Sequence, residues 1–160
     1  MSDYHNLRLD EIQNAVSPAS QKLEVDEAVD ATEFGMNIYR ADPGEQIPWG
    51  YHRHPDHEEL FIVLEGELKF ETPDGPYTVS ADEVFFVPRN HSHRARAVGD
   101  TPARVIAIGA PKEHDDAIIE EECPTCGEVT RRERDVIEEG GETVYVLKCA
   151  DCGTETMRVK

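Results

Sequence analysis

The sequence predicts an all-β protein with one barrel-sized domain followed by a small metal-bound module. Many short apolar runs succeed one another at spacings of about eight to twelve residues, with proline and glycine between them. Such spacing is typical of a β-sandwich or a β-barrel. No long helical pattern interrupts the runs, and two Cys-x-x-Cys-Gly motifs stand near the C-terminus. With 160 residues, the chain has room for one full core and one minor module.

The elements are expected in the following order. Residues 1–20 are polar with a weak helical pattern at Leu7, Ile12 and Val16, which predicts a short helix or an arm packed on the barrel. Turn signals, among them the segments 42–44 and 72–75, then separate the apolar runs. The predicted strands of the first domain are residues 21–25, 34–40, 50–54, 60–64, 68–71, 77–79, 84–87, 93–98 and 104–108.

Four potential metal ligands lie on or beside these strands. His52 and His54 are two positions apart, so both side chains leave the same face of an extended strand. Glu59 opens the apolar run 60–64, and His93 follows a proline-containing turn. A single strand histidine is more often a surface or hydrogen-bonded residue. Three imidazoles and one carboxylate on neighbouring strands, however, form a ligand set for a divalent transition metal.

The spacing of these residues resembles the two motifs of the cupin superfamily: His-x-His, four residues, Glu, six residues, Gly, and later Pro-x-Asn-x-x-His. The second motif departs at Asn90, where the family usually has glycine, and at Ala97, where an asparagine is common. Asparagine tolerates a left-handed backbone, so we expect the turn to be preserved. The resemblance covers residues 32–112 and implies a double-stranded β-helix, the cupin jelly-roll barrel, whose metal ligands are His52, His54, Glu59 and His93.

Other residues near the motifs are candidates for a pocket. His57 and His91 each lie one short turn from a ligand, but the motifs do not include them, so we expect a place at the pocket rim or in solvent. Trp49 and Phe61 are candidates for an apolar wall, although core packing explains Phe61 equally well. The sequence identifies no catalytic acid or base, and the candidates by proximity are Tyr39, Tyr51, His91 and Arg96.

A second metal site is predicted from the two knuckles Cys123-x-x-Cys126-Gly and Cys149-x-x-Cys152-Gly. Four thiolates form a closed tetrahedral site suited to structural Zn²⁺. Residues 123–160, with predicted strands at 128–137, 143–148 and 154–159, resemble a zinc ribbon, which is too small to fold without its metal. A redox Cys-x-x-Cys is normally single and precedes a helix, so redox thiols are disfavoured. A rubredoxin-like iron site has the same geometry and stays an alternative.

The predicted boundaries are an N-terminal arm at 1–31, the cupin barrel at 32–112, a charged linker at 113–122 and the zinc ribbon at 123–160. Zinc ribbons often contact nucleic acid or protein, but residues 120–160 contain six basic and eleven acidic residues. The basic cluster of Arg131, Arg132 and Arg134 is interrupted by acids, whereas a nucleic-acid surface needs a broader positive field. We therefore expect the ribbon to dock a protein partner or to have a structural or oligomerising role.

The charge of the chain excludes some partners. Its 34 acidic and 16 basic residues give a formal net charge of −18, which disfavours nucleic acid and anionic membrane surfaces. Because salt screens such repulsion, the composition favours a halophilic host, with an ordinary acidic protein as the alternative. The sequence contains no apolar run long enough to span a membrane and no secretory signal at residues 1–10, so a cytoplasmic protein is expected.

Several functions are compatible with this combination. A His₃Glu site leaves coordination positions open, which suits a metal-dependent enzyme on a small polar metabolite, such as a dioxygenase or an isomerase. The metal is left undecided among Fe, Mn, Ni and Zn. The alternative is a non-catalytic small-molecule sensor whose ribbon docks a protein partner. Because the run 60–64 is apolar on both faces and cupins commonly pair, a homodimer is expected, with a monomer covered by the N-terminal arm as the alternative.

Overall fold

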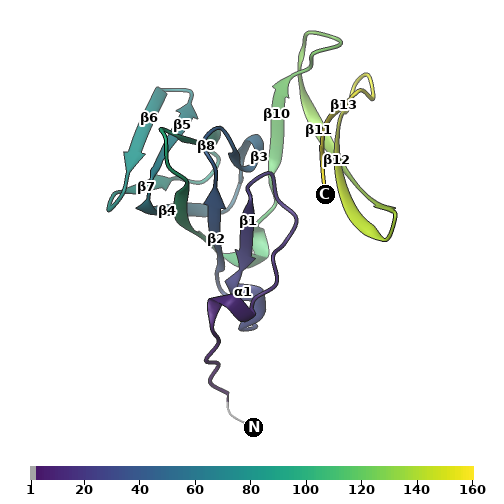
Figure 1. Ribbon diagram of the computed structural model, residues 1–160. Coiled ribbons are helices and arrows are strands. Elements are labelled where there is room, and N and C mark those ends of the chain that lie inside the picture. Colours follow the sequence, from purple (N-terminus) through teal and green to yellow (C-terminus); the bar gives the residue numbers. More distant parts are fainter. Residues whose placement is uncertain (1–2) are drawn as a thin grey trace.

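The computed structural model describes residues 3–160, and their regular secondary structure is almost entirely β-strand, as the sequence predicts. Two antiparallel sheets form the barrel, and the strands of one sheet continue into a smaller module at the C-terminus (Figure 1). No helix in this part of the chain is long and apolar enough to cross a membrane.

The first sheet has five strands in the order β1-β2-β9-β4-β7. The second has eight, in the order β13-β12-β11-β10-β3-β8-β5-β6. The first sheet consists of β1 (Gln21–Glu24), β2 (Gly35–Ala41), β4 (Glu58–Glu65), β7 (Val84–Val87) and β9 (Ala103–Ala110). The second consists of β3 (Gln46–Arg53), β5 (Glu67–Thr72), β6 (Gly75–Ser80), β8 (His93–Val98), β10 (Ile118–Glu122), β11 (Val129–Glu139), β12 (Glu142–Cys149) and β13 (Glu155–Val159).

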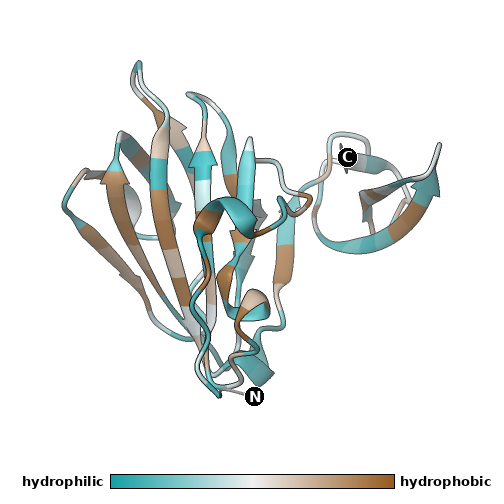
Figure 2. Ribbon diagram, turned by 60° about the horizontal axis from the view of Figure 1, so that its bottom comes forward, coloured by the Kyte–Doolittle hydropathy of each residue, from teal (hydrophilic) through white to brown (hydrophobic). Residues whose placement is uncertain are grey.

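The core lies between the two sheets of the barrel. Alternate residues of each strand point inward, because side chains alternate along an extended chain. Phe61 and Val63 of β4 are almost fully buried, whereas Leu64 is 37% exposed. Figure 2 shows the resulting pattern, with hydrophobic stretches along the barrel strands and hydrophilic residues in the loops. The largest buried side chains of the barrel core are Phe61, Phe70, Ile47, Leu68, Val63 and Val105.

The outer face of the five-stranded sheet is also apolar. Leu60 on β4 pairs with Phe86 on β7, and Ile62 pairs with Val84, so these four side chains share one surface. Phe86 is 51% and Val84 is 62% exposed. The sequence analysis expects this face to be covered by a second copy of the chain or by the N-terminal arm. At its β7 edge the face is exposed.

The N-terminal segment forms an arm rather than an α-helix. Between residue 3 and β1 the one helical element is a single 3-10 turn, η1 (Leu9–Glu11), and Asn14 then forms an isolated β-bridge to Leu23. A one-turn helix that the sequence does not predict, α1 (Val25–Ala28), follows β1. Its buried Asp26 explains the turn, because one carboxylate oxygen accepts the Met36 backbone N–H and the other pairs with Lys112 at 2.8 Å.

A strand also lies in the segment for which the sequence predicts a charged linker. After β9 the chain forms a 3-10 turn, η2 (Lys112–His114), and then β10, which begins with two β-branched apolar residues, Ile118 and Ile119. β10 pairs with β3 of the barrel on one side and with β11 of the module on the other. The barrel and the module are consequently joined by a continuous sheet (Figure 1).

Candidate metal centres

The barrel brings three of the four predicted ligands directly together. His52 on β3 is the register partner of His93 on β8, so their side chains leave adjacent strands on the same face. Glu59 comes from β4 in the opposite sheet and faces them across the interior. One donor atom of each residue lies within 4.8 Å of the others. This trio stands between the two sheets, where the barrel holds all three side chains.

The geometry of this trio fits a metal ion. His93 Nε2 and Glu59 Oε2 lie 3.1 Å apart, and the rings of His52 and His93 have centroids 4.4 Å apart. Nevertheless His52 Nε2, His93 Nε2 and Glu59 Oε2 are buried and have no hydrogen bond of good geometry among the described residues. Buried polar atoms are rarely left without a partner. Their convergence on one point is what a cation would satisfy.

A hydrogen bond sets the tautomer of His52. Its Nδ1 lies 2.8 Å from the carbonyl oxygen of Gly50, which can only accept, so Nδ1 carries the proton and Nε2 presents a lone pair to the trio. Burial, and then the neighbouring His93, lower the pKa of His52 to about 4. The ring is therefore neutral at physiological pH, as a metal ligand must be.

Glu59 is held as a carboxylate. Burial opposes its ionisation, but the interactions with His54 and His93 outweigh burial and hold the pKa of Glu59 well below its usual range. His54 Nε2 lies 3.5 Å from Glu59 Oε1, so the fourth predicted ligand also faces the trio. Burial lowers the pKa of His54, but Glu59 more than compensates and raises it. The two oxygens of the Glu59 carboxylate thus face different imidazoles, Oε1 toward His54 and Oε2 toward His93.

The other nitrogen of His54 faces a residue that the sequence analysis does not single out. Nδ1 of His54 is 3.3 Å from Oδ1 of Asp115, whose side chain is 59% exposed. The same oxygen lies 3.6 Å from Nε2 of His57. Metal-bound histidines usually give their second nitrogen to a carboxylate or a carbonyl, which fixes the ring. Asp115 is placed to do this for His54.

His57 is not exposed to solvent, contrary to one of the expectations from the sequence. Its side chain is 3% exposed, and Nδ1 donates to the carbonyl oxygen of Pro111 at 2.9 Å. The ring fills the space above Gly109, where no side chain could fit beside it. His57 and Glu59 both border a cavity of about 50 Å³. That volume has room for a few water molecules or a very small ligand group.

Only some of the candidate pocket residues line this cavity. Tyr39 and Phe61 line it, together with Asn37, Glu59 and Asp115. The remaining candidates lie elsewhere: the ring of Trp49 packs on Tyr145 of the module, His91 is exposed, Tyr51 lines a different hollow, and Arg96 pairs across strands with Gln46. Burial raises the pKa of Tyr39, so its hydroxyl stays protonated and available as a hydrogen-bond donor.

The module contains a second cluster, formed by all four cysteines. The four Sγ atoms all lie within 4.8 Å of one another. The Sγ atoms of Cys123 and Cys152 are 3.6 Å apart, and those of Cys126 and Cys149 are 3.9 Å apart. A tetrahedron with Zn–S bonds of about 2.3 Å has edges of about 3.8 Å. The sulfur positions therefore match a tetrahedral metal site, and the cluster fits a C-terminal zinc ribbon.

The glycines of the two knuckles make this cluster possible. Gly127 and Gly153 have φ angles of 74° and 73°, a left-handed conformation that favours glycine. Each donates its N–H to the carbonyl of the first cysteine in its knuckle. The Thr130 hydroxyl lies 3.1 Å from the sulfur of Cys149 and, with backbone N–H groups, lowers the pKa of Cys149 to about 6. A thiolate is thus favoured before metal binds.

Comparison with known proteins agrees with the predicted barrel. Residues 37–109 match the family described as "Cupin domain". These residues form a cupin domain. The chain is 36% identical over 78 residues to "Polyketide synthase CurC" of Streptomyces cyaneus, a match that covers 49% of each protein. The chain thus spans about half the length of this relative.

Solved structures share the cupin fold. A sugar phosphate isomerase of the cupin superfamily from Silicibacter pomeroyi superposes with a TM-score of 0.61 at 19% identity, covering 95% of this chain and 92% of that one. A predicted oxalate decarboxylase from Thermotoga maritima superposes with a TM-score of 0.57 at 21% identity, covering 67% and 99%. At these identities the likeness concerns the fold alone.

The sequence analysis leaves His57 between the pocket rim and solvent and does not single out Asp115. His57, Glu59 and Phe61 alternate along the chain, so they share a face, and this periodicity was a usable signal for His57. Asp115 carries no comparable signal, because it lies in an acidic segment far along the chain from Glu59. Only the path of η2, which returns past the open end of the barrel, brings Asp115 to His54.

Proposed function

We propose that the chain is a metal-dependent cupin enzyme that acts on a small polar metabolite. Its metal ligands are His52, His54, Glu59 and His93. The observation that carries the proposal is the convergence of buried, unpartnered donor atoms from β3, β4 and β8 on one point. A ligand set of imidazoles and one carboxylate suits Fe²⁺ or Mn²⁺ and leaves coordination positions for a substrate.

The residues around the centre have separable tasks in this proposal. When bound, the metal supplies Lewis acidity toward a substrate carbonyl or carboxylate, or one-electron chemistry if it is iron. The Tyr39 hydroxyl and the Asn37 amide border the cavity beside Glu59 and provide hydrogen bonds that orient a polar substrate. Phe61 forms the apolar floor. The small cavity favours a compact substrate or the reacting end of a larger one.

The class of reaction follows from the same chemistry. Isomerisation at a carbonyl and oxidation by O₂ both need a metal with open positions and a polar pocket that excludes bulk water. A sugar phosphate isomerase and a predicted oxalate decarboxylase stand among the proteins of similar fold, which supports small oxygen-rich metabolites as the first substrates to test. An isomerase or a dioxygenase is the activity we infer.

The experiment compares two histidine variants in one screen. Protein loaded with Fe²⁺ or Mn²⁺ is assayed for O₂ uptake and for carbonyl turnover on a panel of sugar phosphates and small hydroxy and keto acids. His93→Ala removes a buried ligand and should abolish metal binding and turnover. His91→Ala removes an exposed ring two residues away and should leave both intact. Equal activity of the two variants would remove His93 from the proposed site.

A non-catalytic sensor is the second candidate, and one observation favours it. β10 joins the ligand strand β3 directly to the ribbon, so a change at the metal has a short route to the module. A ligand recovered unchanged from the purified protein, with no turnover for any metal, would select the sensor.

Zinc and a homodimer complete the proposal. We infer that the four cysteines hold structural Zn²⁺, because their sulfur spacing suits the metal and the site is closed. The apolar outer face of β4 and β7 is the surface we assign to a second copy of the chain. Continuous exposed apolar surface of this kind is uncommon on monomers. The chain's net charge of −18 makes nucleic acid an unfavourable partner.

A further inference from the structure

The two metal centres share a single intervening strand. On one side of β10, Ile119 pairs with His52 and Ile118 pairs with Arg53. On the other side, Glu120 and Glu121 pair with Arg131 and Thr130 of β11. The ligand strand of the barrel and the first strand of the ribbon are therefore hydrogen-bonded to the same five-residue segment.

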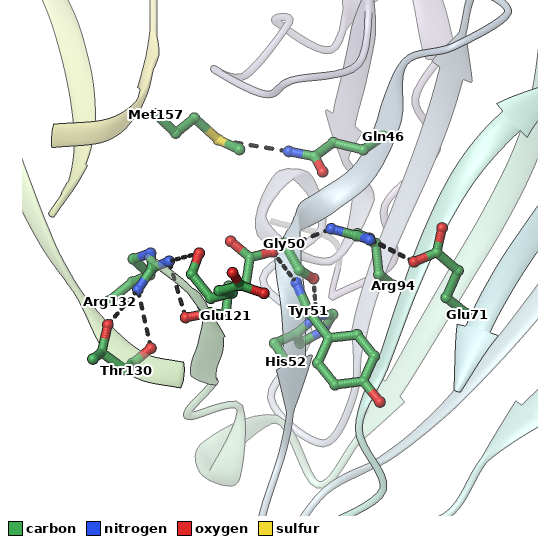
Figure 3. Close-up of polar contacts among 11 residues, drawn as sticks. Gln46, Gly50, Tyr51, His52, Glu71, Arg94, Glu121, Thr130, Arg132 and Met157 are labelled. Carbon is green, nitrogen blue, oxygen red and sulfur yellow. Dashed lines mark hydrogen bonds and ion pairs between the residues drawn. The ribbon is translucent and has the colours of Figure 1, made fainter. Parts of the chain in front are cut away.

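Glu121 contacts the backbone that fixes His52. Its carboxylate oxygen Oε1 accepts the Tyr51 N–H at 2.8 Å, as Figure 3 shows. The same oxygen lies so close to Gly50 that a Cβ at that position would be 2.9 Å away. Gly50 is the residue whose carbonyl accepts the Nδ1 proton of His52. Glu121 thus contacts the two residues of β3 that directly precede His52, through a hydrogen bond at Tyr51 and close packing at Gly50.

On the ribbon side, the buried guanidinium of Arg132 ties the same segment to the cysteine cluster. Its Nη2 donates to the carbonyl oxygens of Glu121 and Glu122 at 3.1 and 3.0 Å. Its Nη1 donates to the carbonyl and to the hydroxyl oxygen of Thr130 at 3.0 and 2.8 Å. Because that hydroxyl oxygen accepts from Arg132, its own proton is free for the sulfur of Cys149, 3.1 Å away. Figure 3 shows this path from Thr130 to His52.

We propose that occupancy of the four-cysteine site sets the metal affinity of the cupin site. Glu121 and Arg132 act as positioning residues along the path, and the proposal rests on the metal centre inferred above. The ribbon depends on its metal for folding. When the cysteines are empty, β11 and Arg132 lose their fixed place, Glu121 is released, and the Gly50 carbonyl no longer holds His52 in one orientation. Metal binding must then also order the His52 ring, and this cost lowers the metal affinity.

Other contacts between the barrel and the ribbon lie outside the Glu121 path. Arg131 lies 3.5 Å from Glu120, whose second oxygen pairs with Arg53 of β3 at 2.6 Å. Trp49 packs on Tyr145 with ring centroids 5.3 Å apart, and Gln46 contacts the sulfur of Met157 at 3.6 Å. Trp49 and Gln46 precede Gly50 in β3, and their side-chain contacts involve neither the Gly50 carbonyl nor the Tyr51 N–H. If the ribbon acted only by being attached to the barrel, these contacts would matter as much as the Glu121 path. Variants of Glu121 therefore distinguish coupling through this path from simple attachment.

The test measures Mn²⁺ affinity in the full chain. The protein is first given one equivalent of Zn²⁺, which the thiolates take in preference, and free Mn²⁺ is then followed by electron paramagnetic resonance. Glu121→Ala should weaken Mn²⁺ binding about tenfold, in line with the effect of residues that orient metal ligands. Glu121→Gln keeps an oxygen acceptor for Tyr51 and should restore most of the affinity. Glu122→Ala is the matched control, because Glu122 is exposed and its carboxylate has no hydrogen bond or ion pair among residues 3–160.

A second arm uses the unaltered chain. Removal of zinc from the cysteines should weaken Mn²⁺ binding by a similar factor, and saturation with Mn²⁺ should raise Zn²⁺ affinity by that same factor, because coupling between sites is reciprocal. Equal Mn²⁺ affinity with and without zinc, and in Glu121→Ala and Glu122→Ala, would overturn the coupling while leaving the metal centre in place. An unaltered chain that binds no Mn²⁺ or Fe²⁺ would instead remove the metal centre, and the coupling with it.

Discussion

His57 lies so close to the backbone of Gly109 in β9 that its imidazole occupies the place where a Cβ would be. Gly109 in turn pairs across the sheet with Gly35 and with Glu59. The cupin pocket therefore depends on a residue without a side chain in β9, and on a histidine that neither of the two cupin motifs contains.

Gly109→Ala should displace the ring of His57. The buried imidazole has no free space to move into, so overpacking should lower the free energy of unfolding by about 1–3 kcal/mol. Thermal denaturation of the metal-free protein measures the loss. Gly35→Ala is the matched control, since a Cβ there would have its nearest neighbour at 3.9 Å, an ordinary contact. If the two variants melt together, His57 is not packed as described.

The chain should bind about two metal ions, one of them zinc. Elemental analysis by mass spectrometry after purification gives the stoichiometry. Cys149→Ser should lose the zinc and destabilise the ribbon while the barrel stays folded. His54→Ala should empty the other site with little loss of stability, because the barrel core is apolar. Full occupancy in His54→Ala would show that His54 is not a ligand.

Asp115→Ala should weaken metal binding at the cupin site. The carboxylate fixes the Nδ1 side of His54, and loss of such a partner typically costs 10–100-fold in metal affinity. Because the Asp115 side chain is 59% exposed, we expect about tenfold, the lower end of that range. Competition with a chelator measures the affinity. Asp116→Ala alters the neighbouring exposed carboxylate and should bind metal as the unaltered chain does.

Thr130→Val should make the zinc site more sensitive to pH. The hydroxyl of Thr130, first among several hydrogen bonds, lowers the pKa of Cys149 from 9.0 to about 6. Without it the thiolate forms only at higher pH, so protons compete with zinc over a range that reaches above neutrality. Thiolate absorbance at 240 nm in the zinc-free protein reports the shift. Thr156→Val, whose hydroxyl donates to the carbonyl of Leu147 instead, should titrate as before.

Phe86→Glu should convert a dimer into a monomer. Phe86 is half exposed on the apolar outer face of β7, and a carboxylate buried against a second copy would have no partner. Size-exclusion chromatography with light scattering measures the mass. Val136→Glu places the same charge on an exposed position of the ribbon and should leave the mass unchanged. A monomeric unaltered chain would contradict the assignment.

Local patterns explain why much of the barrel could be predicted. The turn signals and the alternation of residues 59–64 are encoded by adjacent residues, so most strands appear where the sequence places them. β10 was not predicted because its sequence is mostly acidic, and only its pairing with β3 and β11 makes it a strand. Such pairing lies outside what propensity expresses.

The same distinction between local patterns and long-range pairing applies to the residues of the two sites. The cysteine spacing and the His-x-His pattern are local, and the structure brings those residues together as the pattern suggests. The contacts of Asp115 with His54, and of Glu121 with Tyr51, join residues about sixty to seventy positions apart in the chain. A single sequence contains no periodicity at that range. These partners emerge only when the sheets are assembled.

The position of β10 has a consequence for dissecting the protein. A chain shortened to end at residue 117 would keep every predicted cupin ligand, yet it would leave β3 at the border of its sheet with unpaired N–H and C=O groups. Open borders of this kind recruit strands from other molecules and promote aggregation. Removing the ribbon together with β10 therefore exposes β3 as an edge strand beside the histidines. A truncated protein that contains only the barrel should include β10.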